Sequence, residues 1–336
     1  RDGEAYSQGV TNPSQEWTIM FQAGCTTMAA WANAANCAML AESFRILRNA
    51  ELEKYYTDEA VKAFNFASRQ ENLQLDDLQN IGITSMRGRD FRQMAAAFLY
   101  NLTGDRSWED IMAEESVVKG PQSPIVQYAR KWGEPQYYQL WGAAAYLVCP
   151  QERHYPELYE NLKNSINWQA DTQYVSGLYS RPSRRSANDS RWQTSENLQI
   201  VMMAHYLSTG VRRAELERSM YTEAGWGLGR NPGNIVEMTG LGERHITDCY
   251  TTGRNDGTPG SHPGQTPFNG TETWSPGNGG DARILLDRCY PSWYDGGWPR
   301  QESYFNQRYM WVNGEFTPRE TMRGKMALLA YLYGIR

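Results

Sequence analysis

The chain has 336 residues, of which 40% are hydrophobic and 21% charged, the composition of a globular protein. Its formal net charge of −5 argues against general nucleic-acid binding. No run of about 18 apolar residues is present, so the sequence predicts no membrane span. A basic segment followed by an apolar one is also missing, so any export signal is expected to lie outside these residues.

Most aromatic residues in the chain carry a polar group, because 12 are Trp and 21 are Tyr, against 9 Phe. Trp and Tyr combine an apolar face with a polar edge, which lets them stack on sugar rings while hydrogen-bonding hydroxyl groups. Packing in a large hydrophobic core would also account for many of these Trp and Tyr residues. The excess of Tyr over Phe favours a wet, aromatic groove.

Five cysteines show no C-x-x-C spacing, which argues against a zinc site. Cys25 and Cys37 lie in an apolar stretch typical of core thiols. Cys249 and Cys289 lie in loop-rich sequence and could pair, so the redox compartment stays open.

The first half of the chain reads as a succession of helices. Thr57 is the expected N-cap of the second helix, in which Val61, Phe64 and Phe66 are expected to face the core. The turn from Thr103 to Asp105 should end the third. The predicted helices span residues 18–47, 58–68, 88–102, 108–115, 124–132 and 136–149.

The second half contains further helices, predicted at residues 156–168, 194–207, 213–228 and 318–333. Pro156 suits the first position of its helix. Thr317 and Glu320 form a capping box at the start of the last helix, and Gly334 should end it. The residues expected on the buried face of that helix are Met322, Met326, Leu329 and Tyr333.

About ten helices with short connections and no alternating strand predict an all-α chain of paired helices. We expect residues 1–336 to form a single module. Two connections are long, 176–192 and 229–301, and the second is rich in Gly, Pro, Asn and Thr. Long loops on a helical scaffold are where binding and chemistry usually lie, so residues 229–301 are the expected site region.

The stretch 225–233 contains closely spaced glycines, but it follows a predicted helix rather than a strand, which disfavours a dinucleotide loop. Residues 226–242, which include Leu228-Gly-Arg-Asn-Pro232 and Thr239-Gly-Leu-Gly242, resemble a conserved block of glycoside hydrolase family nine. Residues 262–270 are similar to the proline–glycine loop that follows it, and 303–315 to its acid-bearing loop. Residues 89–105 are similar to its alanine-rich helix.

This resemblance implies an (α/α)6 barrel, here lacking its first helices, and an inverting endo-β-1,4-glucanase. Glu315 aligns with the family's general acid, and it lies on the loop just before the Thr317 cap. Such an acid needs a raised pKa, which we expect burial against aromatic side chains to supply. The residues nearest to the substrate-binding positions of the family, or placed to stack on sugar, are His245, Arg254, Trp298, Tyr309 and Trp311.

The chain also departs from the family pattern. Gly314 separates Asn313 from Glu315, and the aspartate pair that activates water in the family has no counterpart. Asp248, Asp256 and Asp295 are loop candidates for that base, but the Asp256-Gly and Asp295-Gly pairs are more typical of turns. We therefore expect the missing N-terminal part of the same module as a partner.

Four arginines in the 176–192 loop, among them Arg184 and Arg185, would suit a substrate that carries carboxylates, or would be solvated. Plain cellulose or mixed-linkage glucan is favoured slightly over an acidic glucan such as xanthan. A noncatalytic glycan-binding barrel and an (α/α)6 polysaccharide lyase are the alternatives. The resemblance requires no cofactor, leaves structural calcium as an option near Asn255, Asp256 and Asp281, and implies secretion.

Overall fold

The computed structural model describes residues 24–81, 84–127, 136–172, 192, 198–249, 261–267, 306, 314, 316, 318 and 320–335. The chain divides into two compact units, Gln22–Ala170 and a second made of Arg1–Phe21 with Asp171–Arg336. Each unit is described by itself. Among the described residues, no helix is both long enough and apolar enough to cross a bilayer.

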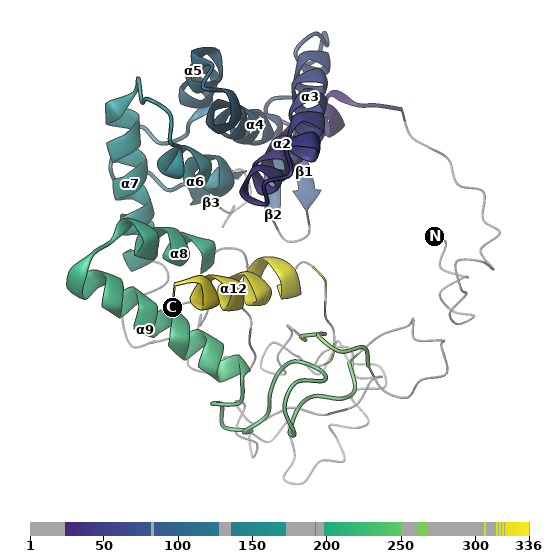
Figure 1. The fold of residues 1–336 in the computed structure, drawn as a ribbon, viewed down its shortest axis with the longest axis vertical. Coiled ribbons are helices and arrows are strands. Elements are labelled where there is room, and N and C mark those ends of the chain that lie inside the picture. The colour runs from purple at the N-terminus through teal and green to yellow at the C-terminus, as the bar shows by residue number, and fades with distance from the viewer. Residues whose placement is uncertain are drawn as a thin grey trace, which may run out of the picture. The chain divides into compact units, whose positions relative to one another are not determined.

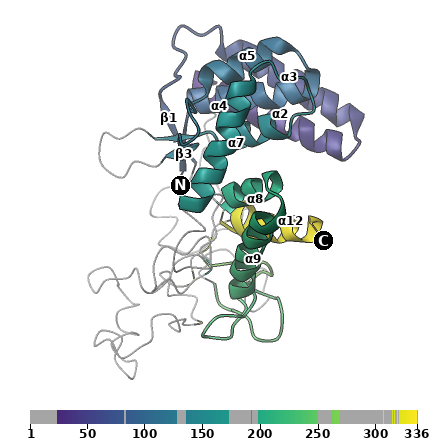
Figure 2. The same cartoon turned by 90° about the vertical axis from the view of Figure 1, so that its left-hand side faces the viewer.

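The Gln22–Ala170 unit is built around one helix, α4 (Gly88–Thr103), which contacts α2, α3, α5 and α6 (Figure 1). Fully buried alanines on α2 and α4, such as Ala34 and Ala96, let these helices approach closely. Figure 2 shows the same group of helices from the side. The other helices of the unit are α2 (Thr27–Ile46), α3 (Ala50–Ala67), α5 (Arg106–Glu115), α6 (Leu140–Val148) and α7 (Pro156–Ala170).

Two short antiparallel strand pairs lie in this unit, although the sequence predicted none. β1 (Leu78–Ile81) pairs with β2 (Thr84–Arg87), and β3 (Val126–Gln127) pairs with β4 (Tyr137–Tyr138). The helix predicted over 124–132 is therefore wrong where it is described, and the one predicted from residue 136 begins at Leu140.

Several predicted boundaries are confirmed and others are wrong. α4 ends where predicted, because Gly104 adopts a left-handed conformation with φ of 70°. α3 begins at Ala50 instead of residue 58, since the Asn49 side chain accepts a hydrogen bond from the Leu52 N–H at 3.1 Å. Thr57 lies inside that helix, where its hydroxyl donates to the Glu53 carbonyl. Helix α2 begins at Thr27, so the helix predicted from residue 18 is wrong over 24–26.

The predicted inward face of α3 is half correct. Phe64 is buried and makes edge-on ring contacts with Trp31 and Trp108. Phe66 is 41% exposed, because residues two apart on a helix do not share a face.

The second unit holds α8 (Leu198–Leu207), α9 (Gly210–Gly227), the π-helix η6 (Glu320–Met326) and α12 (Ala327–Gly334). α12 packs against α8 and α9 (Figure 1). The closing helix was predicted as one regular α-helix, but its first part is π-helical. The wider turn of a π-helix shifts the register, so Met322, Met326 and Tyr333 are exposed, whereas Leu328 and Leu332 are buried. The predicted buried face of this helix is therefore wrong for the three exposed residues, whereas Leu329, the fourth, is half-buried.

His205 joins α8 to α12 in the core of this unit. Its Nδ1 atom lies 2.8 Å from the Tyr331 hydroxyl, which itself donates to the Met202 carbonyl at 3.0 Å. That hydroxyl has a single hydrogen, so Nδ1 is the donor in the bond between them. Burial, and to a smaller degree the charge of Arg213, lowers the pKa of His205 below its ordinary 6.5, against the opposing effect of Glu217.

We expect the free energy of unfolding of this unit to fall as the pH drops below about 6.5. The unfolded chain then binds a proton that the folded His205 resists, so acid favours unfolding. Urea titrations at pH 7.5 and pH 5.5 should show a pH-dependent midpoint, and His205→Gln should reduce that dependence. His262→Gln, at an exposed histidine, is the control and should keep it. An unchanged pH dependence in His205→Gln would contradict the assignment.

Candidate functional site

The segment after α9 folds back on itself in a compact loop. Val236 forms β-bridges with both Leu228 and His245. The Asn231 side chain closes the turn between them: its amide donates to the Trp226 and Ile235 carbonyls, both at 2.8 Å. Asn231 of the motif thus shapes the loop.

A second segment, residues 261–267, is fastened to this loop through Thr239. The Thr239 N–H donates to the Gln265 carbonyl at 3.0 Å, and the Gly264 N–H donates to the Thr239 carbonyl at 2.8 Å. The Thr239 hydroxyl donates to the His262 carbonyl and accepts from the Gln265 N–H. The two motif segments, separate in sequence, therefore lie side by side.

Lys325 anchors residues 261–267 to the π-helix. It is fully buried, and its ammonium group donates to the Thr266 hydroxyl at 2.9 Å and lies 3.3 Å and 3.4 Å from the Thr266 and Pro267 carbonyls. The Thr266 hydroxyl also bonds the Thr321 hydroxyl at 2.8 Å. A buried ammonium needs such partners, and the carbonyls provide them. Sequence reasoning missed this residue, although a lysine among apolar helical residues is a signal.

Trp192 completes this scaffold. Its backbone N–H donates to the buried Glu237 carboxylate at 2.6 Å, and its ring lies 5.9 Å from the Lys325 ammonium. Gly227 is required beneath the ring, because an added Cβ there would come within 2.0 Å of it. Glu237 in turn donates its N–H to the Gly227 carbonyl. The sequence predicted no role in the site for either Trp192 or Glu237.

His245 lies on the surface of the loop and is half-buried. Its Nδ1 atom is 2.8 Å from the Gly242 carbonyl oxygen, which can only accept a hydrogen bond. Nδ1 therefore carries the proton in the neutral ring, and Nε2 is the acceptor. An acceptor nitrogen of this kind suits a sugar hydroxyl.

Asp248 lies near His245 in a stretch whose backbone is fixed. The N–H groups of Thr247 and Asp248 both donate to the Asn306 side-chain oxygen, at 3.0 Å and 2.9 Å. The Cys249 N–H donates to the Ser261 hydroxyl, and Cys249 is buried. This ties the predicted site region to residue 306, upstream of the predicted acid.

The remaining predicted site residues lie outside the described part of the chain. These are Glu315, Arg254, Trp298, Tyr309, Trp311, Arg184 and Arg185, together with Asp256, Asp295, Asn255, Asp281, Cys289 and Thr317. Their roles stay predictions, as do the calcium site and the pairing of Cys249 with Cys289. Within the described residues, no group of three or more His, Cys, Asp or Glu side chains is placed to hold a metal ion.

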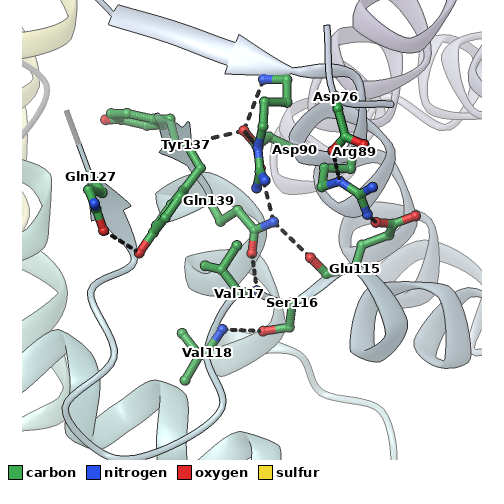
Figure 3. A network of polar contacts seen from close by, with 12 residues as sticks. Asp76, Arg89, Asp90, Glu115, Ser116, Val117, Val118, Gln127, Tyr137 and Gln139 are labelled. Carbon is green, nitrogen blue, oxygen red and sulfur yellow. Dashed lines mark hydrogen bonds and ion pairs between the residues drawn. The ribbon is translucent and has the colours of Figure 1, made fainter. Parts of the chain in front are cut away.

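Buried carboxylates in the Gln22–Ala170 unit serve structure. Asp90 is fully buried and accepts from the Arg87 side chain, the Tyr138 N–H and the Gln139 amide (Figure 3). Gln139 also donates to the Glu115 carbonyl and accepts from Val117 N–H. The arrangement leaves no oxygen of Asp90 without a donor, so the group suits a structural role and not proton transfer.

Glu109 is held in the same manner. Its carboxylate accepts from the Tyr146 hydroxyl at 2.7 Å, from the His154 N–H at 2.9 Å and from the His154 ring at 2.6 Å. Burial, together with this bond to Glu109, raises the pKa of Tyr146 far above its usual range. Tyr146 thus remains a donor at any physiological pH.

We expect Lys325→Met to loosen residues 261–267 by leaving the Thr266 and Pro267 carbonyls without their buried donor. The cost should be about 1–3 kcal/mol. Hydrogen exchange should accelerate at the Gly264 and Gln265 amides, which bond Thr239. Lys62→Met, on the exposed face of α3, is the matched control and should change neither quantity. Unchanged exchange at Gly264 and Gln265 in Lys325→Met would show that the ammonium does not hold the segment.

Comparison with known proteins gives one family and one fold. Residues 8–315 match the family model described as glycosyl hydrolase family 9. Among solved structures, a thermostable endoglucanase from Alicyclobacillus acidocaldarius is similar with a TM-score of 0.63 and 17% identity, covering 96% of this chain and 58% of that one. No curated protein matches the chain.

Two further structures agree. The family 9 protein of Bacteroides ovatus has a TM-score of 0.60 and 18% identity, over 92% of this chain and 54% of that one. The endoglucanase of the termite Nasutitermes takasagoensis has a TM-score of 0.57 and 15% identity, over 93% and 66%. The chain therefore spans little more than half the length of the first structures that it matches.

Proposed function

Because the chain belongs to glycosyl hydrolase family 9, we propose that it is part of an enzyme that hydrolyses β-1,4-glucosidic bonds in a cellulose-like backbone with inversion. Its helices match an (α/α)6 barrel over about half the length of the related structures. The observation that carries the proposal is the family match itself, which runs through both loop segments and ends at residue 315.

In this proposal Glu315 is the general acid. It donates a proton to the departing glycosidic oxygen, so it must keep that proton at the working pH. Burial against aromatic side chains would supply the raised pKa that this role needs. His245, with its Nε2 acceptor, and Arg254 would contact sugar hydroxyls, and Trp298, Tyr309 and Trp311 would stack on the rings.

An inverting mechanism also needs a base that holds the attacking water, about 6.5–9.5 Å from the acid. We propose that this base comes from the part of the module that these 336 residues do not supply. The chain covers 58% of the Alicyclobacillus acidocaldarius structure, so that protein contains residues that have no counterpart here.

The proposed substrate is cellulose or a mixed-linkage glucan, ahead of an acidic glucan such as xanthan. Arg184 and Arg185 would favour the acidic polymer if they lined the groove, since guanidinium groups pair with carboxylates in bidentate fashion. A polymeric substrate that cannot enter cells supports an extracellular location.

A reducing-end assay on cellulose, β-glucan, xanthan and lyase-trimmed xanthan tests the proposal. Release of reducing ends with α-anomeric products, followed by NMR, is the expected result. Products that absorb in the ultraviolet would indicate a lyase. Binding without any cleavage, by the chain together with the rest of its module, would indicate a noncatalytic glycan-binding barrel.

A further inference from the structure

A cavity of about 400 Å³ lies in the Gln22–Ala170 unit, between the end of α3, the start of α4 and the end of α5. This volume is within the range of about 300–1,000 Å³ that is typical of small-ligand pockets. We call the cavity the α4–α5 pocket; its lining includes Ser68, Leu73, Leu75, Arg89, Arg92 and Glu115. Both charged and apolar side chains line it, so a ligand with both kinds of surface would fit.

Two arginines of the pocket share one buried carboxylate. The Glu115 side chain is 2% exposed and accepts hydrogen bonds from Arg92 and, at 2.7 Å, from Arg89. Figure 3 shows Arg89 between Glu115 and Asp76. Asp76 and Glu114 also pair with the arginines, but they are 76% and 67% exposed, so water and salt screen their charges. The interior of the cluster therefore carries more positive than negative charge, which favours an anionic ligand.

Arg92 has hydrogen-bonding capacity left over. Its Nη1 atom bonds Glu115 and lies 3.5 Å from Glu114, whereas its Nε and Nη2 groups have no partner among the described residues. The N–H groups of Nε and Nη2 form an edge that binds a carboxylate in bidentate fashion. The Arg92 side chain is 20% exposed, so a carboxylate on this edge would be partly shielded from water, which strengthens the pair.

Leucines give the pocket an apolar wall with a fixed backbone. The indole N–H of Trp31 donates to the Leu73 carbonyl, and the Arg89 N–H donates to the Leu75 carbonyl, both at 2.9 Å. The C–H groups of a sugar ring would lie against this alkyl surface with little loss of hydration.

The pocket also offers acceptors for hydroxyl groups. The Ser68 hydroxyl donates its hydrogen to the Phe64 carbonyl at 2.9 Å, which leaves the Ser68 oxygen as an acceptor. The Glu114 carboxylate lines the pocket too and can only accept. A ligand that carries hydroxyl groups beside its carboxylate would use all of these partners.

We propose that the α4–α5 pocket binds a uronate unit of a glycan, with its carboxylate on the free edge of Arg92 and its ring against Leu73 and Leu75. A neutral sugar has no anion for that edge, and an alkyl carboxylate has no hydroxyl groups for Ser68 and Glu114. The pocket is a binding site and takes no part in bond cleavage. This inference goes beyond the proposed hydrolysis and does not rest on it.

The test is titration calorimetry of the 336-residue chain with methyl β-glucuronide and methyl β-glucoside, which differ only in the carboxylate. The glucuronide should bind at least about tenfold more tightly. Arg92→Lys keeps a positive charge beside Glu115 but has no planar fork, so it should weaken glucuronide binding at least about tenfold. Leu73→Asp should weaken it as well, because the new carboxylate repels the ligand; Leu73 is 37% exposed, so this variant should fold.

Arg106→Lys is the matched control, since Arg106 pairs with Asp110 at 3.6 Å on the surface of α5 and does not line the pocket. It should leave glucuronide binding unchanged. The proposal is overturned if the glucuronide does not bind, if both glycosides bind equally, or if Arg92→Lys and Leu73→Asp both bind as tightly as the parent.

Two further results would also count against the proposal. Cyclohexanecarboxylate that binds as tightly as the glucuronide would show that the pocket does not recognise a sugar. Binding that is lost in Arg184→Lys but kept in Arg92→Lys would assign uronate recognition to the 176–192 loop. None of these readouts depends on hydrolysis, so the proposed catalysis can fail or succeed separately.

Discussion

Glu315→Gln is expected to lower turnover on β-1,4-glucan by about 10²–10⁴-fold in the complete module. The glutamine side chain keeps the size of glutamate but has no proton to donate, so the leaving oxygen would depart as an unprotonated alkoxide. Substrate affinity should change little, because the acid acts mainly in the transition state. Steady-state kinetics should therefore show a fall in kcat with KM nearly unchanged.

Glu243→Gln provides the control for this experiment. Glu243 is an exposed carboxylate in the same loop region, two residues from His245, and its loss should leave kcat within about twofold of the parent. Circular dichroism should show both variants folded. Near-normal turnover in Glu315→Gln would mean that another group is the acid, whatever the family match implies.

Local signals in the sequence were sufficient for part of the fold. α4 was predicted nearly to the residue, because its apolar spacing and the Gly104 stop both act within one or two turns. Pro156 likewise begins α7 as predicted. Helix starts and stops of this kind depend on residues that are neighbours in the sequence, so they can be predicted from the sequence alone.

Features that depend on distant partners were not predictable in this way. β4 forms where Tyr138 N–H meets the Asp90 carboxylate, 48 residues away in sequence. The π-helix places Lys325 beneath Thr266, which is 59 residues away, and thereby turns Tyr333 outward. No feature of residues 318–333 themselves indicates the bond between Lys325 and Thr266. The spacing of their apolar residues therefore predicted a regular α-helix.

The candidate site shows the same division. The order of the motifs indicated that residues 226–242 and 262–270 belong to one site region, and Thr239 does join the two segments. The residues that support them, Glu237 and Trp192, contact each other across 45 residues and carry no motif of their own. A family resemblance thus identifies the loops, whereas the contacts that hold them require the folded chain.

Asp90→Ala is expected to destabilise the Gln22–Ala170 unit by about 3–5 kcal/mol. The carboxylate is fully buried and accepts from the Arg87 guanidinium at 2.7 Å, the Arg87 N–H at 2.9 Å, the Gln139 amide at 3.0 Å and the Tyr138 N–H at 3.2 Å. Its removal takes the acceptor away from all of these donors and leaves the Arg87 cation without its carboxylate. Asp90→Asn should also be costly, because every neighbour of the carboxylate is a donor and an amide presents only one acceptor oxygen. Urea denaturation followed by circular dichroism measures the change.

Asp58→Ala is the matched comparison, since Asp58 also pairs with a cation on a helix, Lys54, but both side chains are exposed. Solvent and salt screen such a pair, so its loss should cost no more than about 0.5 kcal/mol. The contrast between the two aspartates separates burial from charge pairing as the source of stability. Equal and small losses in both variants would show that the Asp90 network contributes no more than a surface ion pair. A large loss in Asp90→Ala alone, partly recovered when Arg87 is also replaced by Met, would establish that the cost lies in the unpaired, partly buried cation.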